Sequence, residues 1–302
     1  MHPALLLLIY CLLSVVASLS GGWVPMVVRL THRRMQIAIS FVSGMILGIG
    51  LLHLLPHSFE ILGSIDQTVV WVLAGFLFMF FLERFFHFHH HDVPDDGGHA
   101  DNPAPGRPPA QADHNHDPAH AHEHAKIPFA FSLAGAAVGL TLHSLVDGVA
   151  MAAAVKADDG NSLVAWAGAG ACLAVVLHKP FDSLTIGTLM AAAGRSAASK
   201  HFLNALYALV TPLGVVLFYA LSSRAGQPQE GLGQALGFAA GAFVCIATSD
   251  LLPELQFHRH DRAALSAALV AGIALAWSMV FLEDGGHGHE HSPLHAVEHD
   301  HE

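Results

Sequence analysis

Apolar residues along this chain gather into eight long blocks separated by polar stretches. The blocks lie near residues 4–28, 36–58, 67–86, 127–155, 162–193, 202–221, 231–256 and 263–283. Each can supply about 20 helical residues, the length that crosses a hydrocarbon core about 30 Å thick. Apolar and polar residues do not alternate within them, which argues against the strands of a membrane barrel. The pattern predicts an all-α polytopic membrane protein with eight transmembrane helices.

Composition strengthens this prediction and excludes several classes of protein. Of 302 residues, 53% are apolar and only 12% are charged, against about 25% charged in ordinary soluble domains. The 13 Lys and Arg residues face 24 Asp and Glu residues with no basic patch, so nucleic acid is not an expected partner. The three cysteines lie inside apolar blocks without a CxxC pair, which excludes a disulfide scaffold and a thiolate metal site.

The first block also has features of a signal peptide. Leu5–Leu8 resembles a hydrophobic core, and the small residues Ser18 and Gly21 follow it. No Lys or Arg precedes this run, however, and apolar residues continue through Val28. A retained helix is favoured, and cleavage stays open.

Positive charges predict the orientation. With the N-terminus outside, ten Lys and Arg residues fall in cytoplasmic loops and two in outer loops, a positive-inside bias. The ten are Arg29, Arg33, Arg34, Arg84, Arg107, Lys126, Arg195, Lys200, Arg259 and Arg262, and the two are Lys156 and Arg224. Both termini are therefore expected outside. The expected organisation is helices 1–3 in residues 1–86, a cytoplasmic loop in 87–126, helices 4–8 in 127–283 and a tail in 284–302.

Histidine is unusually abundant, with 25 residues in the chain. Ten lie in the loop 87–126 and six in the tail from His287 to Glu302. The loop has too few apolar residues to offset the entropy of ordering it, so we expect it to be disordered. Neutral imidazole binds Zn²⁺, Cu²⁺ and Ni²⁺. The histidines are interleaved with Asp and Glu, unlike those of a purification tag. Two such segments favour a role in metal handling, although their composition does not identify the metal.

Ionisable residues inside the fourth and fifth blocks are the strongest functional signal, because such residues are costly within a bilayer. His143 and Asp147 are four residues apart, as are His178 and Asp182, so each pair shares one helix face. Facing each other, the pairs would offer two imidazole nitrogens and two carboxylate oxygens, a set suited to Zn²⁺. The alternative is that each His simply hydrogen-bonds its own Asp as a contact between helices.

Lys179 and Pro180 separate the members of the second pair. A lysine beside the site would repel a second divalent ion, so one metal position is expected rather than a binuclear centre. The lysine could also extend away or pair with Asp182. Pro180 is expected to kink its helix because it lacks a backbone donor.

Two further pairs lie near helix ends. His53 and His57 close the second block toward the outer face, and Asp250 and Glu254 close the seventh toward the cytoplasm. They would suit the entrance and the exit of a metal path. They would equally suit ordinary interfacial helix ends, where polar residues are tolerated.

These motifs together resemble the ZIP (Zrt/Irt-like) family of metal-ion permeases. His143-Ser-Leu-Val-Asp147-Gly148 is similar to the family's fourth-helix signature and His178-Lys179-Pro180-Phe181-Asp182 to its fifth. Leu52-His53-Leu54-Leu55-Pro56 and Asp250-Leu-Leu-Pro253-Glu254 resemble the ends of its second and seventh helices. The resemblance covers the whole chain.

The resemblance implies transport of divalent cations, chiefly Zn²⁺, toward the cytoplasm, with a primary site of His143, Asp147, His178 and Asp182. It also implies elevator-like movement of the first and fourth to sixth helices against the rest. Ser144 and Lys179 depart from the Asn and Glu of many members, and such a lysine resembles the subgroup thought to work with one site.

The expected partners are divalent ions and the lipid bilayer of a plasma or bacterial inner membrane. Fe²⁺, Mn²⁺ and Cd²⁺ stay open as substrates, and so does a homodimer. No P-loop is present, so transport without ATP is expected.

Two alternative functions remain. A cation-diffusion-facilitator exporter would be expected to have six helices and internal termini, and an intramembrane zinc hydrolase would need a general base. We expect a transporter and not an enzyme.

Overall fold

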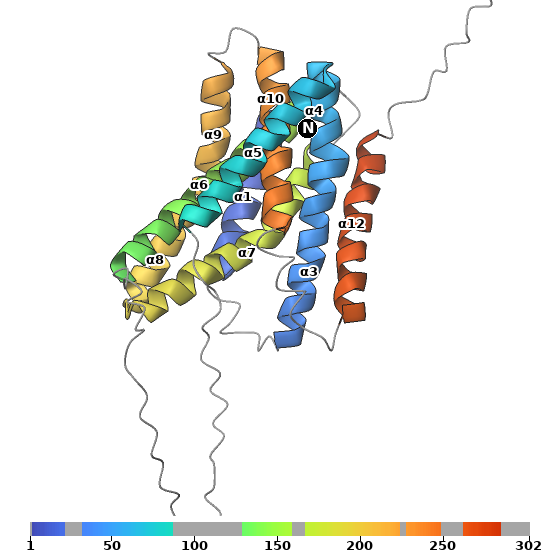
Figure 1. Cartoon of the computed structure of the whole chain (residues 1–302). Coiled ribbons are helices and arrows are strands. Elements are labelled where there is room, and N and C mark those ends of the chain that lie inside the picture. Colours follow the sequence, from blue (N-terminus) through green and yellow to red (C-terminus); the bar gives the residue numbers. More distant parts are fainter. Residues whose placement is uncertain are drawn as a thin grey trace, which may run out of the picture.

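The computed structural model describes residues 2–21, 32–86, 129–158, 167–223, 228–248 and 262–284. Within these ranges the regular elements are helices, without strands (Figure 1). The prediction of an all-α protein is confirmed. The His-rich loop 87–126, the tail and most of the connections lie outside the described residues.

Each of the eight predicted blocks contains a helix. In chain order the elements are α1 (Pro3–Gly21), α3 (His32–Ile49), the π-helical turn η1 (Gly50–Leu54), α4 (Leu55–Leu62), α5 (Ile65–Phe86), α6 (Phe129–Asp158), α7 (Ala169–Ala192), α8 (Ala197–Ala208), α9 (Val210–Ser222), α10 (Pro228–Ile246) and α12 (Arg262–Asp284). The second block is built from α3, η1 and α4 in succession, and the sixth from α8 and α9.

Six helical segments of the described chain are long and apolar enough to cross a membrane: Pro3–Gly21, Arg33–Leu62, Ile65–Phe85, Ala137–Asp158, Ala197–Ser222 and Arg262–Met279. Helices α7 and α10 are not among them. Helix α7 carries His178, Lys179 and Asp182, and α10 begins with the polar residues Gln229, Glu230 and Gln234. These side chains lower the mean hydropathy of both helices. Eight membrane crossings, and the sidedness of the termini, therefore stay predictions.

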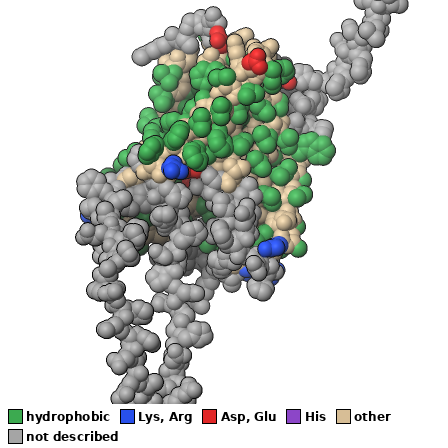
Figure 2. Space-filling view, in the orientation of Figure 1, with side chains coloured by type: hydrophobic (Ala, Val, Ile, Leu, Met, Phe, Trp, Pro, Cys, Tyr) green, Lys and Arg blue, Asp and Glu red, His purple; other side chains and the backbone are tan. Residues whose placement is uncertain are grey.

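Large apolar side chains face outward along the bundle. Leu12, Val16, Val70, Val216 and Trp277 are each more than half exposed. Hydrophobic side chains cover most of the described surface in Figure 2, with acidic groups at its upper end and basic groups lower down. An apolar exterior on this scale is costly in water and suits lipid, so the chain is an integral membrane protein.

The helices pack as two sets. In the first set α1 lies against α7 and α8, and α6 lies against α9 and α7. In the second set α3 lies against α12, and α10 lies against α5 and α4. The sets meet mainly where α10 and α5 contact α6 and where α3 contacts α7 (Figure 1).

Helix α6 approaches α9 closely because both present glycine at the contact. A Cβ atom built on Gly148 would lie 2.1 Å from the Thr211 carbonyl oxygen, and one on Gly214 would lie 2.4 Å from the Leu145 carbonyl oxygen. Neither distance is compatible with a side chain. This contact fixes the segment of α6 that carries His143 and Asp147.

Candidate metal site

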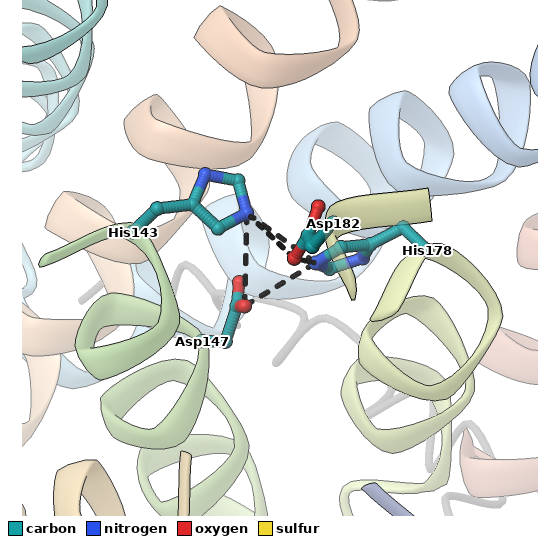
Figure 3. A group of neighbouring side chains, drawn as sticks. All are labelled: His143, Asp147, His178 and Asp182. Atoms are coloured by element: carbon teal, nitrogen blue, oxygen red, sulfur yellow. Dashed lines mark hydrogen bonds and ion pairs between the residues drawn. The ribbon is translucent and has the colours of Figure 1, made fainter. Parts of the chain in front are cut away.

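Helices α6 and α7 bring four candidate ligands together inside the bundle. His143 and Asp147 project from α6, and His178 and Asp182 from α7, so that all four converge on one point (Figure 3). The i, i+4 spacing within each helix places both members of a pair on the face that meets the other helix. His143, Asp147 and His178 are buried, and Asp182 is largely so.

The ligand atoms are spaced as a small divalent ion requires. The Nε2 atoms of His143 and His178 lie 3.5 Å apart. From Asp147 Oδ2 the distance is 3.2 Å to His178 Nε2 and 3.7 Å to His143 Nε2. From Asp182 Oδ2 the corresponding distances are 3.9 and 3.7 Å. A tetrahedral ion with bonds of about 2.0–2.1 Å separates its ligand atoms by about 3.3 Å, so only small movements would close the shell.

The His178 ring is held in the tautomer that a metal needs. Its Nδ1 lies 2.7 Å from the Ala174 carbonyl oxygen. A carbonyl can only accept, so Nδ1 carries the proton and donates it, leaving the Nε2 lone pair directed at the cluster. The alternative that each His merely bonds its own Asp does not describe this geometry, because the carboxylate nearest to His178 Nε2 is that of Asp147 on the other helix, at 3.2 Å against 3.9 Å for Asp182.

Lys179 points into the site. Its Nζ lies 2.8 Å from Asp147 Oδ2 and 3.6 Å from Asp182 Oδ2, and its side chain is 1% exposed. It also donates to Ser144 Oγ at 2.6 Å. The alternative that the lysine extends away is therefore wrong. Its ammonium group lies beside the four candidate ligands and bonds one of them, Asp147.

Tyr207 on α8 completes the polar surroundings. Its hydroxyl donates to Asp182 Oδ2 at 3.2 Å and accepts from Ser144 Oγ at 2.5 Å. Its ring faces Lys179 Nζ, 5.2 Å from the ring centre, an arrangement favourable for a cation. Three helices thus fix the two carboxylates of the cluster.

Asp147 still has capacity to bind a cation. Its Oδ1 is buried and has no hydrogen-bond partner among the described residues. A buried carboxylate oxygen without a partner is costly. Two carboxylates against one lysine leave the cluster with a net negative charge when the imidazoles are neutral. The donor set therefore fits one divalent ion better than two.

The other sequence-predicted ligands lie apart from this cluster. His53, in η1, is buried, and His57, in α4, is partly exposed, with their ring centres 4.6 Å apart. His57 Nε2 lies 3.3 Å from Asp158 Oδ1 at the end of α6. Asp250 and Glu254 fall outside the described residues, so their role stays a prediction.

Sequence reasoning missed Tyr207 and Asp158. Tyr207 shares a buried face of the short helix α8 with Asn204, three residues earlier, but nothing in the sequence pairs that face with Asp182. Asp158 follows the predicted block 127–155, in a short polar stretch that is typical of an ordinary connection. Only the packing of distant helices reveals either contact.

Comparison with known proteins gives a consistent result. The family model described as "ZIP Zinc transporter" matches residues 5–281. The chain is 29% identical over 146 residues to zinc transporter ZIP1 of Bos taurus, covering 48% of this chain and 42% of that protein. It is 29% identical over 167 residues to zinc transporter ZIP9 of Micropogonias undulatus, covering 50% and 51%. It is 26% identical over 302 aligned positions to zinc transporter ZIP4 of Rattus norvegicus, covering 83% and 43%. The chain thus spans about half the length of these relatives or less.

Proposed function

Because the chain belongs to the ZIP zinc transporter family, we propose that it carries divalent metal ions, with Zn²⁺ as its principal substrate, through the membrane. The observation that carries the proposal is the buried group of His143, Asp147, His178 and Asp182. Such a group is expensive within a bundle of apolar helices. Binding of a metal ion by these closely spaced side chains would explain why the protein keeps them there.

In this proposal the four side chains replace the water shell of the ion. Imidazole nitrogen suits Zn²⁺ and tolerates Fe²⁺, Mn²⁺ and Cd²⁺, while carboxylate oxygen compensates the charge. Lys179 stays bound to Asp147 and limits the site to one ion. One retained positive charge also weakens the hold on the metal, which helps a carrier to release its cargo.

We propose that transport runs toward the cytoplasm. A negative-inside potential favours this direction, because a divalent ion gains about 4.6 kcal/mol per 100 mV, twice the single-charge value. The membrane concerned is proposed to be the plasma or bacterial inner membrane. Within the molecule, the set formed by α1, α6, α7, α8 and α9 would move as a unit relative to the other set, carrying all four ligands with it.

Two alternatives have less support. An exporter of the cation-diffusion-facilitator type is disfavoured by the family match over residues 5–281. A zinc hydrolase would need a nucleophile or a base beside the metal. Ser144 Oγ instead bonds Lys179 and Tyr207, so it is not activated for attack.

The test is metal flux into proteoliposomes containing the full chain. Zn²⁺, Fe²⁺, Mn²⁺ and Cd²⁺ are each supplied outside, and uptake is followed with an imposed inside-negative potential. Uptake of Zn²⁺ that rises with the potential supports the proposal. Uptake no faster than in protein-free liposomes would contradict it, and a tag on the C-terminus establishes the sidedness of the inserted protein.

A further inference from the structure

A second His–Asp arrangement, outside the cluster of four, reproduces the geometry of His178. The His57 Nδ1 lies 3.0 Å from the carbonyl oxygen of His53, four residues earlier, and its Nε2 lies 3.3 Å from Asp158 Oδ1. His178 bonds the carbonyl four residues earlier in the same way and faces Asp147 through Nε2. Both histidines are therefore oriented by their own helix toward a carboxylate on α6.

With this orientation, a proton or a metal ion is needed between His57 and Asp158. The carbonyl of His53 can only accept, so the His57 proton resides on Nδ1. In the neutral ring Nε2 then presents a lone pair to a carboxylate oxygen, and two acceptors repel each other at 3.3 Å. Either a second proton or a metal ion must lie between them. The separation equals the spacing of about 3.3 Å between ligands of a tetrahedral ion.

Asp158 is held in place for this role. Its Oδ2 accepts from the Gly168 backbone N–H at 2.7 Å, at the start of α7. Its other oxygen is thereby turned to His57. The Asp158 side chain is 6% exposed and that of His57 is 24% exposed. The carboxylate is thus fixed within the protein, while water can reach the imidazole side and complete a partly hydrated metal shell.

Both arrangements take their carboxylate from helix α6. Asp147 and Asp158 are 11 residues apart, about three helical turns and about 16 Å, so they lie on nearly the same face of α6. We propose that His57 and Asp158, with His53 beside them, bind a partly hydrated divalent ion such as Zn²⁺, and that this ion then passes along α6 to the cluster of four. Only the onward passage rests on the proposed transport function.

The binding of the ion is tested on crystals of the full chain grown with Zn²⁺. Anomalous difference maps at the zinc absorption edge locate each ion, so metal on the histidine-rich segments does not interfere. A peak between His57 Nε2 and Asp158 Oδ1, in addition to one at the His143 cluster, is expected. The D158N variant keeps an acceptor for Gly168 and should lose only the first peak. A zinc-saturated crystal with a peak at the cluster alone would overturn the proposal and leave a protonated ion pair.

The passage of the ion is tested by uptake kinetics. Asp158→Asn should raise KM for Zn²⁺ by about tenfold or more, the range found when even an outer-shell partner of a metal ligand is lost. Its maximal rate should be retained, because the cluster of four is intact. Asp66→Asn, the same change at an exposed carboxylate, should alter neither. An unchanged KM in Asp158→Asn would overturn the loading role. Absence of uptake by the wild-type chain would instead contradict the proposed function, and the crystal experiment would still decide the site.

Discussion

At Asp147 one carboxylate oxygen faces three nitrogen atoms and the other has no hydrogen-bond partner among the described residues. Oδ2 lies within 3.7 Å of His143 Nε2, 3.2 Å of His178 Nε2 and 2.8 Å of Lys179 Nζ. Oδ1 is the buried oxygen without a partner. Oδ2 can therefore bond the lysine and face both imidazoles at once, because a carboxylate oxygen accepts more than one hydrogen bond.

Tyr207 should act as a positioning residue for Asp182. Tyr207→Phe keeps the ring that faces Lys179 and removes the hydroxyl that bonds Asp182 and Ser144. Loss of such an outer-shell partner should raise KM for Zn²⁺ by about tenfold, with a smaller effect on the maximal rate. Uptake kinetics in proteoliposomes measure both.

Tyr219→Phe is the matched control, since Tyr219 lies on α9 with 36% of its surface exposed. Equal effects of the two substitutions would show that the Tyr207 hydroxyl does not position Asp182.

Lys179 is predicted to limit the site to one ion. Lys179→Glu exchanges the cation beside Asp147 and Asp182 for a carboxylate, a change of two charge units where screening by water is weak. A second zinc ion should then bind next to the first. Anomalous maps of zinc-grown crystals should gain one peak at the cluster, whereas Lys179→Gln should not. A single peak in the Glu variant would mean that the lysine does not exclude the second ion.

At the scale of helices, the contact of α6 with α9 supports the site. Gly148→Ala would place a Cβ 2.1 Å from the Thr211 carbonyl oxygen, so the two helices must separate. We expect a loss of stability of about 1–3 kcal/mol, typical of overpacking, and reduced uptake because His143 and Asp147 move with α6. Thermal unfolding in detergent measures the first effect.

Gly187→Ala on α7 provides the comparison, since a Cβ there meets nothing within 4 Å. It should leave the melting temperature unchanged or raise it slightly, because alanine is favoured over glycine inside a helix. A Gly148→Ala protein as stable as this control would contradict the assigned packing.

The helices themselves were predictable, because continuous apolar blocks of about 20 residues specify them directly. The residues at which the helices begin and end were harder to predict. The second block was placed at 36–58, whereas its helical elements run from His32 to Leu62. The apolar pattern did not predict the π-helical turn Gly50–Leu54.

The grouping of the four candidate ligands was also predictable in part, since His and Asp four residues apart must share a helix face. What spacing could not reveal is which helix faces which. Tyr207 meets Asp182 across 25 positions, and His57 meets Asp158 across about a hundred. Such contacts depend on which helices pack together, and a single sequence does not identify those partners.

At the scale of the whole molecule, the His-rich loop is predicted to adjust activity without forming the path. The candidate ligands of the cluster all lie on α6 and α7, outside residues 87–126. Deleting residues 89–124 should therefore leave zinc uptake measurable while lowering the amount of metal bound per chain. Uptake and bound zinc are measured on the same membrane-inserted preparation. Complete loss of uptake with normal insertion would contradict the prediction.

The central claim is that His143, Asp147, His178 and Asp182 act as one transport site. Ligands of one ion are coupled, so their substitutions should not add. The decisive measurement is zinc uptake by proteoliposomes containing His143→Ala, His178→Ala or both substitutions, normalised to inserted protein. Each single variant should lose most of the flux, and the double variant should lose little more. Near-normal flux in the double variant would place the transport site elsewhere in the molecule.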